Sequence, residues 1–161
     1  MAIAVGDRMP AAKLLEIGDN GPQEVPLESL IGGRKVALFG MPGAYTGTCT
    51  GEHIPSLISS RDAFAAQGID TMLVVVVNDP FVADAWSQST GAGDAGIRIL
   101  TDPTSAFVTA LGLNFDAPPV GFIGRSKRFA AILDDGVVKA LNVDEPGTCS
   151  MTSGEALLKE L

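Results

Sequence analysis

The chain has 161 residues, of which 46% are hydrophobic and 19% charged, so it can bury a core and is too apolar to be disordered. An excess of acidic residues gives a net charge of −8, which argues against a nucleic-acid partner. No apolar run approaches the roughly 20 residues of a membrane helix, and no signal-peptide pattern opens the chain. Two cysteines are too few for a disulfide framework, so the sequence predicts a reducing, cytoplasmic setting. Because no membrane helix is predicted, no membrane partner is expected.

Strands and helices are predicted to alternate through the first two thirds of the chain. The run VALF indicates a buried strand, and the longer run TMLVVVV is typical of a parallel strand covered on both faces. Asp79-Pro80 and Asp102-Pro103 are typical helix starts, in which the aspartate caps and the proline takes the first helical position. Pro55 should bend the helix that contains it. We expect strands at 11–17 (an edge strand), 23–27, 35–40, 70–77 and 97–101, and helices at 27–30, 53–67, 80–88 and 103–111.

The last third of the chain predicts a hairpin and a closing helix. The turn DDG at 134–136 is the best hairpin signal, with arms at 128–133 and 137–143. Residues 114–119 are expected to be irregular. A capping box at 152–155 begins the final helix. The apolar residues expected to face inward from that helix are Ala156, Leu157, Leu158 and Leu161.

The order of these elements predicts the fold class. Strands that alternate with helices give a mainly parallel core, and the late hairpin adds antiparallel arms. We therefore expect an α/β fold, a thioredoxin-like sandwich with a central mixed β-sheet, helices on both faces and an N-terminal hairpin extension. No repeat, linker or low-complexity tract interrupts the chain, so residues 1–161 are expected to form a single domain.

Cys49 has the most distinctive position in the sequence. It follows a buried strand and a loop at 41–45, and it lies in or beside the first turn of a helix that Thr46 or Thr48 could cap, with Glu52 behind. Unpaired N–H groups and the positive end of the helix dipole favour a thiolate at such a place. The alternative is a buried structural thiol, the usual fate of a free cysteine, but the threonine-rich neighbourhood favours reactivity.

A cation near Cys49 would stabilise a thiolate further. Arg128 is the attractive candidate, because it opens a hairpin arm that could lie beside the first central strand. Periodicity does not choose between it and the other arginines. Those alternatives are Arg34, Arg61, Arg98 and Arg125.

His53 lies four residues after Cys49, a spacing that places two side chains on one helical face. It could be a base or half of a metal site, but one histidine and two cysteines without a C-x-x-C motif argue against a metal. We favour a histidine that is hydrogen-bonded within the helix start. Gly43, in the loop before Cys49, is a second candidate supporting residue.

The residues around Cys49 resemble the peroxiredoxin family. PGAYTGTC, at 42–49, matches the peroxiredoxin signature P-x-x-x-T-x-x-C, and LFGMPGAYTGTCTGEHIP is similar to the peroxiredoxin-5-like (type II) subfamily. KRF, at 127–129, followed by DDGVVKALNV, resembles the C-terminal hairpin of that subfamily, so the resemblance covers nearly the whole chain. Gly47 departs from the pattern, because relatives commonly carry proline there.

This resemblance implies a thioredoxin fold and a thiol peroxidase that reduces hydrogen peroxide and small organic hydroperoxides without metal, haem or flavin. Cys49 would be the peroxidatic nucleophile, which becomes a sulfenic acid that a thiol then reduces. Thr46 would hydrogen-bond the thiolate and the peroxide, and Pro42 would shield the site from water. Arg128 would stabilise the thiolate and the transition state.

Cys149 lies where some members of the subfamily keep a resolving cysteine. The loop at 144–148 looks shorter here, so two interpretations stay open: a resolving thiol that reaches Cys49 after rearrangement, or a spectator. Other members depend on an external thiol, which makes glutaredoxin, glutathione or thioredoxin the expected reductant. Relatives usually pair as homodimers with the cysteine pockets near the contact, and the same is expected here.

Two other functions fit parts of the sequence. A cysteine hydrolase would use Cys49 with His53 as its base, but it would need a third, orienting group that the sequence does not offer. A redox sensor or holdase would oxidise Cys49 without efficient turnover. Trp86 and Phe81 are expected to belong to helix packing or to a subunit contact.

Overall fold

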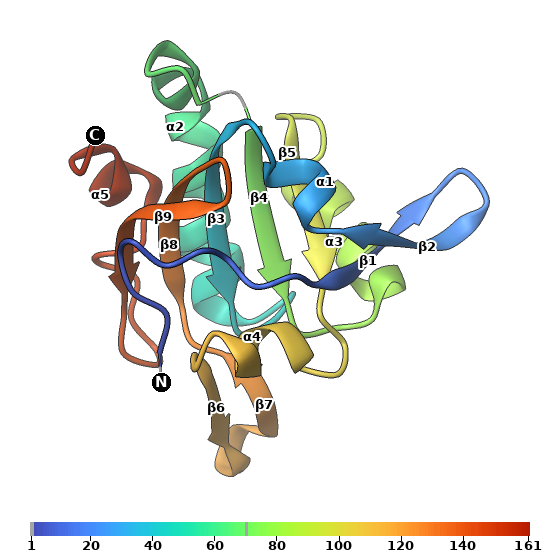
Figure 1. The fold of residues 1–161 in the computed structure, drawn as a ribbon. Coiled ribbons are helices and arrows are strands. Elements are labelled where there is room, and N and C mark those ends of the chain that lie inside the picture. The colour runs from blue at the N-terminus through green and yellow to red at the C-terminus, as the bar shows by residue number, and fades with distance from the viewer. Residues whose placement is uncertain (1, 70) are drawn as a thin grey trace.

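The computed structural model describes residues 2–69 and 71–161, and its centre is a seven-stranded mixed sheet in the order β2-β1-β5-β4-β3-β8-β9 (Figure 1). β3, β4 and β5 run parallel, and the other neighbouring strands pair antiparallel. The strands of this sheet are β1 (Lys13–Gly18), β2 (Gly21–Pro26), β3 (Lys35–Met41), β4 (Thr71–Val76), β5 (Ile97–Thr101), β8 (Phe129–Asp134) and β9 (Val137–Val143). The predicted mixed sheet is therefore confirmed. Asp70, predicted to begin the β4 strand, lies outside the described residues.

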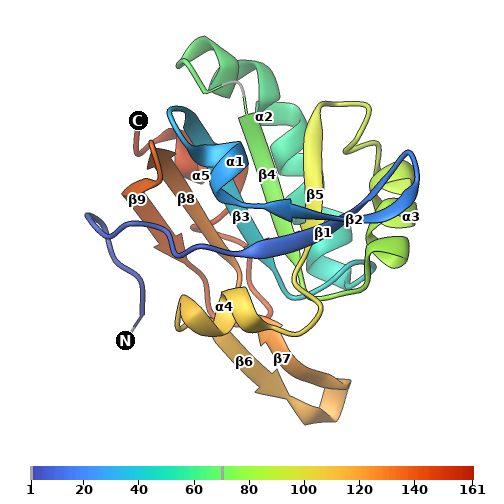
Figure 2. The same ribbon diagram turned by 45° about the vertical axis from the view of Figure 1, so that its right-hand side comes forward.

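Alternate residues of the central strands face two different helical layers. On β3, Val36 and Leu38 belong to one apolar cluster, whereas Ala37, Phe39 and Met41 belong to another. Helices α1 and α4 contribute side chains to the first cluster, and α2, α3 and α5 contribute to the second (Figure 2). The helices are α1 (Glu28–Ile31), α2 (Ile54–Ala66), α3 (Pro80–Thr90), α4 (Ala106–Ala110) and α5 (Gly154–Leu158). This confirms helices on both faces and explains the consecutive apolar residues within β3 and β4.

Both predicted hairpins form. β1 and β2 pair around the turn at 18–21, and β8 and β9 pair around the DDG turn. The N-terminal hairpin also joins the main sheet, because Leu15 of β1 pairs with Thr101 of β5. β1 is therefore flanked on both sides and is not the edge strand that the sequence suggested; β2 is the edge.

A third hairpin was not predicted. Residues 114–119 were expected to be irregular, but β6 (Asn114–Ala117) pairs antiparallel with β7 (Phe122–Ser126) across the short 3₁₀ turn η2 (Pro118–Val120). These strands are too short and too exposed to show a clear apolar alternation, so the sequence carried little signal. The hairpin projects below the main sheet in Figure 1, and Phe115 packs edge-on against Phe122 within it.

The start of α4 differs from the prediction, whereas the start of α3 agrees with it. α4 begins at Ala106 and not at Pro103, although the carboxylate of Asp102 still accepts hydrogen bonds from the N–H groups of Phe107 and Val108, at 3.2 and 3.0 Å. A turn through Ser105, whose φ is 64°, separates the aspartate from the helix. Asp79 caps α3 as expected, through a 2.9 Å bond from the N–H of Val82.

The closing helix α5 is also capped differently. Ser153, and not Thr152, accepts the N–H of Ala156 at 3.1 Å, because the Thr152 hydroxyl is bound to Asp144. Leu157 is fully buried, but Leu161 is 48% exposed and does not face inward as predicted. Among the described residues, no helix is both long enough and apolar enough to cross a membrane.

Candidate active site around Cys49

The carboxyl end of β3 brings the predicted site residues together. β8 runs antiparallel to β3, and Gly40 near the end of β3 pairs with Phe129 at the start of β8. Arg128 directly precedes Phe129, so the backbone register places it beside the loop that leads to Cys49. Gly40 is required at this crossing, because a Cβ atom there would collide with the ring of Phe129. The expectation that the hairpin arm lies beside the first central strand is confirmed.

Arg128 is the arginine that reaches the cysteine. Its Nη1 atom donates a hydrogen bond to Cys49 Sγ at 3.0 Å. Cys49 is fully buried, and Arg128 is 3% exposed, so the contact is shielded from solvent. A guanidinium in contact with a sulfur in a dry site favours the ionised sulfur. Two of the alternative arginines are engaged elsewhere: Arg98 binds Glu16, and Arg125 binds the carbonyl oxygen of Pro42.

The helix start that carries Cys49 is unusual. Residues Cys49–His53 form a π-helical turn, η1, in which the N–H of Ile54 bonds to the carbonyl oxygen of Cys49. The predicted cap is wrong: Thr48 makes no capping hydrogen bond, and the hydroxyl of Thr46 donates backwards to the carbonyl of Gly43 at 2.9 Å. Neither the Thr46 nor the Thr48 hydroxyl therefore caps the backbone N–H groups of this helix start.

The loop before Cys49 is held by two residues from other parts of the chain. Arg125 donates from Nη1 to the carbonyl oxygen of Pro42 at 3.1 Å, and Asn78 accepts the N–H of Ala44 at 2.7 Å. A Cβ atom on Gly43 would displace the guanidinium of Arg125 from its place beside this loop. These roles were not predicted from the sequence, although Asn78 follows β4 just as the Cys49 loop follows the parallel neighbour β3.

Tyr45 in the same loop has a left-handed backbone, with φ of 62°. Such a conformation costs a non-glycine residue of order 1–3 kcal/mol and persists where the surroundings impose it. Here the surroundings include Ser89 on α3, whose hydroxyl lies 3.5 Å from the Tyr45 hydroxyl. The loop shape is therefore set by contacts on several sides.

His53 is buried beside Arg128 and is hydrogen-bonded as expected, but its partners lie outside the helix start in which they were predicted. Its Nδ1 atom lies 3.4 Å from Arg128 Nη1, and its Nε2 atom lies 2.7 Å from the carbonyl oxygen of Thr152. Burial, followed by the charge of Arg128, lowers the pKa of His53 to about 3. The imidazole is therefore neutral near pH 7 and is too weak a base for the hydrolase mechanism that the sequence left open.

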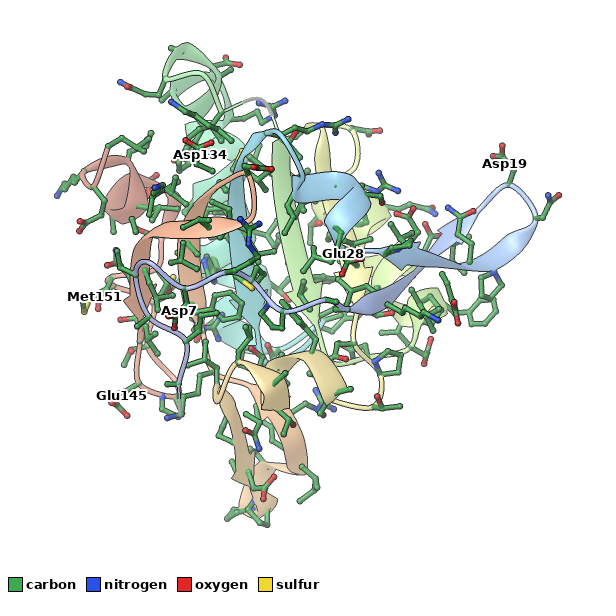
Figure 3. The ribbon with its side chains drawn as sticks, viewed as in Figure 1. Asp7, Asp19, Glu28, Asp134, Glu145 and Met151 are labelled. Atoms are coloured by element: carbon green, nitrogen blue, oxygen red, sulfur yellow. The ribbon has the colours of Figure 1, made fainter. Side chains whose placement is uncertain are left out.

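Cys149 lies in a different setting, on the turn between β9 and α5. It is partly buried, and the Thr152 hydroxyl is 4.0 Å from its sulfur. Burial raises the pKa of the Cys149 thiol. Figure 3 shows Glu145 and Met151, which bracket this turn, projecting outward from the same side of the molecule. Both cysteines are free thiols, so the structure represents the reduced state.

A pocket of about 290 Å³ opens over the site. Pro42, Thr46 and Arg128 line it, and the unpredicted β6–β7 hairpin adds Phe115 and Phe122. Its walls therefore combine the polar groups around Cys49 with a mainly apolar surface.

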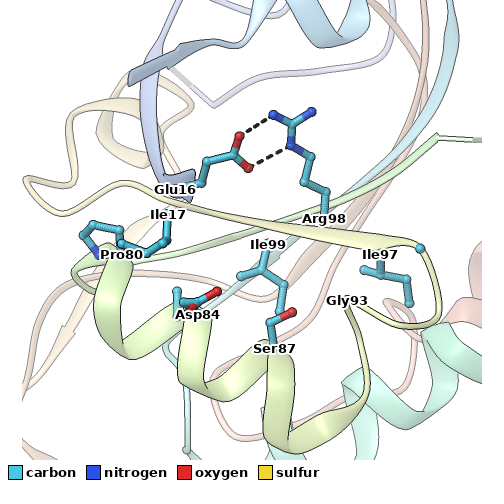
Figure 4. A pocket seen from close by; sticks show the side chains of 11 residues that line it. Glu16, Ile17, Pro80, Asp84, Ser87, Gly93, Ile97, Arg98 and Ile99 are labelled. Atoms are coloured by element: carbon cyan, nitrogen blue, oxygen red, sulfur yellow. Dashed lines mark hydrogen bonds and ion pairs between the residues drawn. The ribbon is translucent and has the colours of Figure 1, made fainter. Parts of the chain in front are cut away.

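A second pocket, of about 310 Å³, lies between α3 and strands β1 and β5 (Figure 4). The Glu16–Arg98 ion pair borders it, with Asp84 and Ser87 on the opposite side. None of the predicted site residues lines this second pocket. Among residues 2–69 and 71–161, no three histidine, cysteine or acidic side chains come together in a way that could hold a metal ion.

Comparison with known proteins gives consistent matches. The Redoxin family profile matches residues 4–157. Peroxiredoxin-2E-2, chloroplastic, from Oryza sativa subsp. japonica is 42% identical over 163 residues, which span 99% of this chain and 72% of the relative. The crystal structure of reduced Prx3 in complex with H₂O₂ from Vibrio vulnificus has a TM-score of 0.90 at 39% identity and covers 98% of both chains. Peroxiredoxin 5 from Alvinella pompejana has a TM-score of 0.85 at 32% identity, covering 98% of this chain and 97% of its own.

Proposed function

Because the chain belongs to the redoxin family and is a peroxiredoxin, a thiol-dependent peroxidase, we propose that Cys49 is its peroxidatic nucleophile and that Arg128 is the main group that activates it. The 3.0 Å bond from Arg128 Nη1 to Cys49 Sγ is the observation that carries this assignment. The guanidinium stabilises the thiolate before the reaction and the negative charge that spreads over sulfur and both peroxide oxygens during it.

The chemistry needs no group from outside the protein other than the two substrates. The thiolate attacks one peroxide oxygen, an S–O bond forms and the O–O bond breaks. The departing oxygen takes a proton and leaves as water or as an alcohol, and Cys49 becomes a sulfenic acid. A thiol then attacks the sulfenic sulfur and releases water, and a second thiol reduces the resulting mixed disulfide to regenerate Cys49.

The pocket supports both hydrogen peroxide and small organic hydroperoxides as substrates. Arg128 supplies a donor at Cys49, and the Thr46 hydroxyl, whose hydrogen is bound to Gly43, lines the pocket. Phe115 and Phe122 offer apolar surface for the organic part of a hydroperoxide. Pro42 is buried and lines this pocket, where it would keep water from the sulfur. Because the pocket is about 290 Å³, bulky hydroperoxides should react more slowly than hydrogen peroxide.

Peroxide consumption tests the proposal directly. Without a donor, the reduced protein should consume about one equivalent of peroxide, and with excess thiol it should turn over; Cys49→Ser should abolish both. Trp86, the only tryptophan, donates to the Thr50 hydroxyl at 3.0 Å, so its fluorescence can follow the oxidation of the adjacent Cys49. Oxidation without turnover by any donor would instead favour the redox sensor.

The proposed electron donor is glutaredoxin, glutathione or thioredoxin. The Cys49 sulfur is fully buried, whereas a reductant must touch it, which favours a small thiol or a partner that inserts an exposed cysteine. Side-by-side turnover assays with the three donors, at equal thiol concentration, would rank them. If none supported turnover, this part of the proposal would fail while the single-turnover reaction remained.

We further propose a homodimer in the cytoplasm. Phe81 and Tyr45 are 64% and 54% exposed, and large exposed aromatic side chains are typical of interfaces. Sedimentation of the protein and of Phe81→Glu tests the association: the variant should be more monomeric. The two free thiols suit a reducing compartment, and microscopy of a tagged full-length chain tests the location.

A further inference from the structure

A continuous chain of hydrogen bonds runs from the C-terminal turn to the cysteine. The carboxylate of Asp144 binds Thr152, the carbonyl of Thr152 binds His53, His53 meets Arg128, and Arg128 binds Cys49. The backbone closes this chain into a ring, because the N–H of Asp144 donates to the carbonyl oxygen of Arg128 at 3.0 Å.

The contact between His53 and Arg128 fixes how the guanidinium is turned. Nη1 of an arginine carries two hydrogen atoms, and here they have two partners: Cys49 Sγ at 3.0 Å and His53 Nδ1 at 3.4 Å. Nδ1 can accept only if the proton of the neutral ring is on Nε2. The carbonyl oxygen of Thr152, at 2.7 Å from Nε2, accepts that proton and so selects this tautomer.

The Thr152 carbonyl is itself held in place by Asp144. The carboxylate accepts from the N–H and the hydroxyl of Thr152, at 3.0 and 2.8 Å, and also from Ser150 and Met151. Asp144 is 4% exposed. Burial alone would raise the pKa of Asp144, but the hydrogen bonds, first of all that from Thr152, lower it, so the carboxylate stays ionised at neutral pH.

We propose that His53, Thr152 and Asp144 are positioning residues that orient the Arg128 guanidinium toward Cys49. This inference rests on the proposed function. His53 supplies an acceptor that stops the guanidinium from rotating away from the sulfur, and Asp144 keeps the turn that selects the tautomer of His53. The charged groups facing the imidazole are Arg128 and, through Thr152, Asp144. None of the three positioning residues touches the peroxide.

Two substitutions of His53 separate its two contacts. Asn places its amide oxygen as many bonds from the backbone as Nδ1, so His53→Asn can still accept from Arg128 but loses Thr152. Gln places its amide nitrogen at the position of Nε2, so His53→Gln keeps the bond to Thr152 but loses the acceptor for Arg128. Both variants replace a buried ring by an amide, and Asn, which is one methylene shorter than Gln, leaves the larger cavity, so cavity formation alone would make His53→Asn the more damaging change.

The expected result is an unequal loss of the single-turnover peroxide rate. His53→Gln should lose about 10-fold, which is less than the roughly 100-fold cost of removing a charge-stabilising donor outright, and His53→Asn about 3-fold. The same order should appear without peroxide, as a slower alkylation of Cys49 at pH 7. Asp144→Asn, at the far end of the chain, should resemble His53→Asn in both measurements.

Equal effects of the two His53 variants in both measurements would overturn the inference and leave His53 as a packing residue. Thermal unfolding of each variant shows whether it is folded. If both His53 variants fold poorly, Asp144→Asn tests the inference instead. A wild-type protein that did not reduce peroxide would contradict the proposed function. The alkylation rates would in that case still show whether His53 orients Arg128, so the two failures are distinguishable.

Discussion

Cys49 and Cys149 place the same side chain in two contrasting regions of the molecule. Cys49 is fully buried at a π-helical turn, with a guanidinium nitrogen 3.0 Å from its sulfur. Cys149 is partly exposed on the C-terminal turn, and the donor near its sulfur is a neutral hydroxyl at 4.0 Å. The more accessible cysteine therefore lacks the cationic partner. Under the proposed function, reactivity toward peroxide should follow the partner of the sulfur and not its exposure.

The two regions are nevertheless connected. The turn that carries Cys149 ends at Thr152, whose carbonyl binds His53 next to the Cys49–Arg128 pair. Both cysteines are free thiols here, so a disulfide between them would require a rearrangement of this turn, which Asp144 holds by several hydrogen bonds. The structure thus gives Cys149 a fixed neighbourhood in the reduced protein, and its role as a resolving or a spectator thiol depends on whether that neighbourhood opens.

The largest expected effect comes from removing the charge that distinguishes the two sulfurs. Arg128→Ala should lower the single-turnover peroxide rate by about 100-fold or more, the range seen when one donor to a developing negative charge is lost. Stopped-flow fluorescence after mixing the reduced protein with peroxide measures this rate.

Arg98→Ala is the matched control for this prediction. It also removes a guanidinium, but one that pairs with Glu16 beside the second pocket. The peroxide rate of this control should stay within about 2-fold of the wild type, since partly exposed ion pairs contribute only ~1 kcal/mol or less, and here to stability alone. Equal losses for the two arginine variants would mean that Arg128 acts through the fold.

A smaller effect is expected from Cys149→Ser. The rate at which peroxide first oxidises Cys49 should stay within about 2-fold of the wild-type rate, because Cys149 does not supply the activating contact. Non-reducing mass spectrometry of the wild type after one equivalent of peroxide then identifies the role of Cys149. An intramolecular Cys49–Cys149 disulfide indicates a resolving thiol, whereas a persistent sulfenic acid indicates a spectator. A Cys149→Ser variant that no longer reacted with peroxide would contradict the comparison of the two sites.

The position of Cys49 after a buried strand and the central sheet were predicted for physical reasons that act locally. Apolar runs identify β3 and β4, and the polar loop before Cys49 indicates a helix start. Arg128 was placed by the hairpin turn that follows it together with the resemblance. Asn78, Arg125 and Asp144 were not assigned roles, because each acts on a segment that is distant in the sequence or through a turn whose shape depends on packing.

The start of α5 shows that a contact outside the helix can also override a suitable local pattern. A capping box was predicted at 152–155, where the residue types are suitable, but the hydroxyl of Thr152 donates to the carboxylate of Asp144. The neighbouring Ser153 accepts the capping hydrogen bond instead. The pattern predicted the existence of α5 correctly and its first residue incorrectly, because the bond to a charged acceptor outside the helix orients the Thr152 hydroxyl.

The burial of His53 beside Cys49 should make the protein less stable at acidic pH. The pKa of His53 is about 3 in the folded state, whereas the unfolded chain binds this proton below about pH 6.5. The unfolded state therefore binds more protons between these values, so the free energy of unfolding falls as the pH decreases from 6.5 toward 3. The His53 contribution to this slope is at most about 1.4 kcal/mol per pH unit.

Denaturant unfolding at pH 7, 6 and 5 measures this slope for the wild type and for His53→Asn, which lacks the titrating group. The variant should be less stable at pH 7 but should lose stability more slowly on acidification. Asp144 contributes with the same sign at lower pH: its pKa is lowered in the folded state, so its stabilisation is lost as the carboxylate is protonated. Parallel slopes for the two proteins would show that His53 can be protonated within the fold.

The smallest expected effect is a difference in the free energy of unfolding between variants at the two helix starts next to the cysteines. Ser153 caps α5, beyond Cys149, through its 3.1 Å bond from the N–H of Ala156, whereas Thr48 makes no capping bond at the turn of Cys49. Ser153→Ala should therefore lower the free energy of unfolding by about 1 kcal/mol, and Thr48→Ala by less than about 0.5 kcal/mol. Chemical denaturation at pH 7 resolves this difference. A larger loss for Thr48→Ala would mean that the helix start at Cys49 is capped in solution, in which case its N–H groups would not be free to interact with the sulfur or with a bound peroxide.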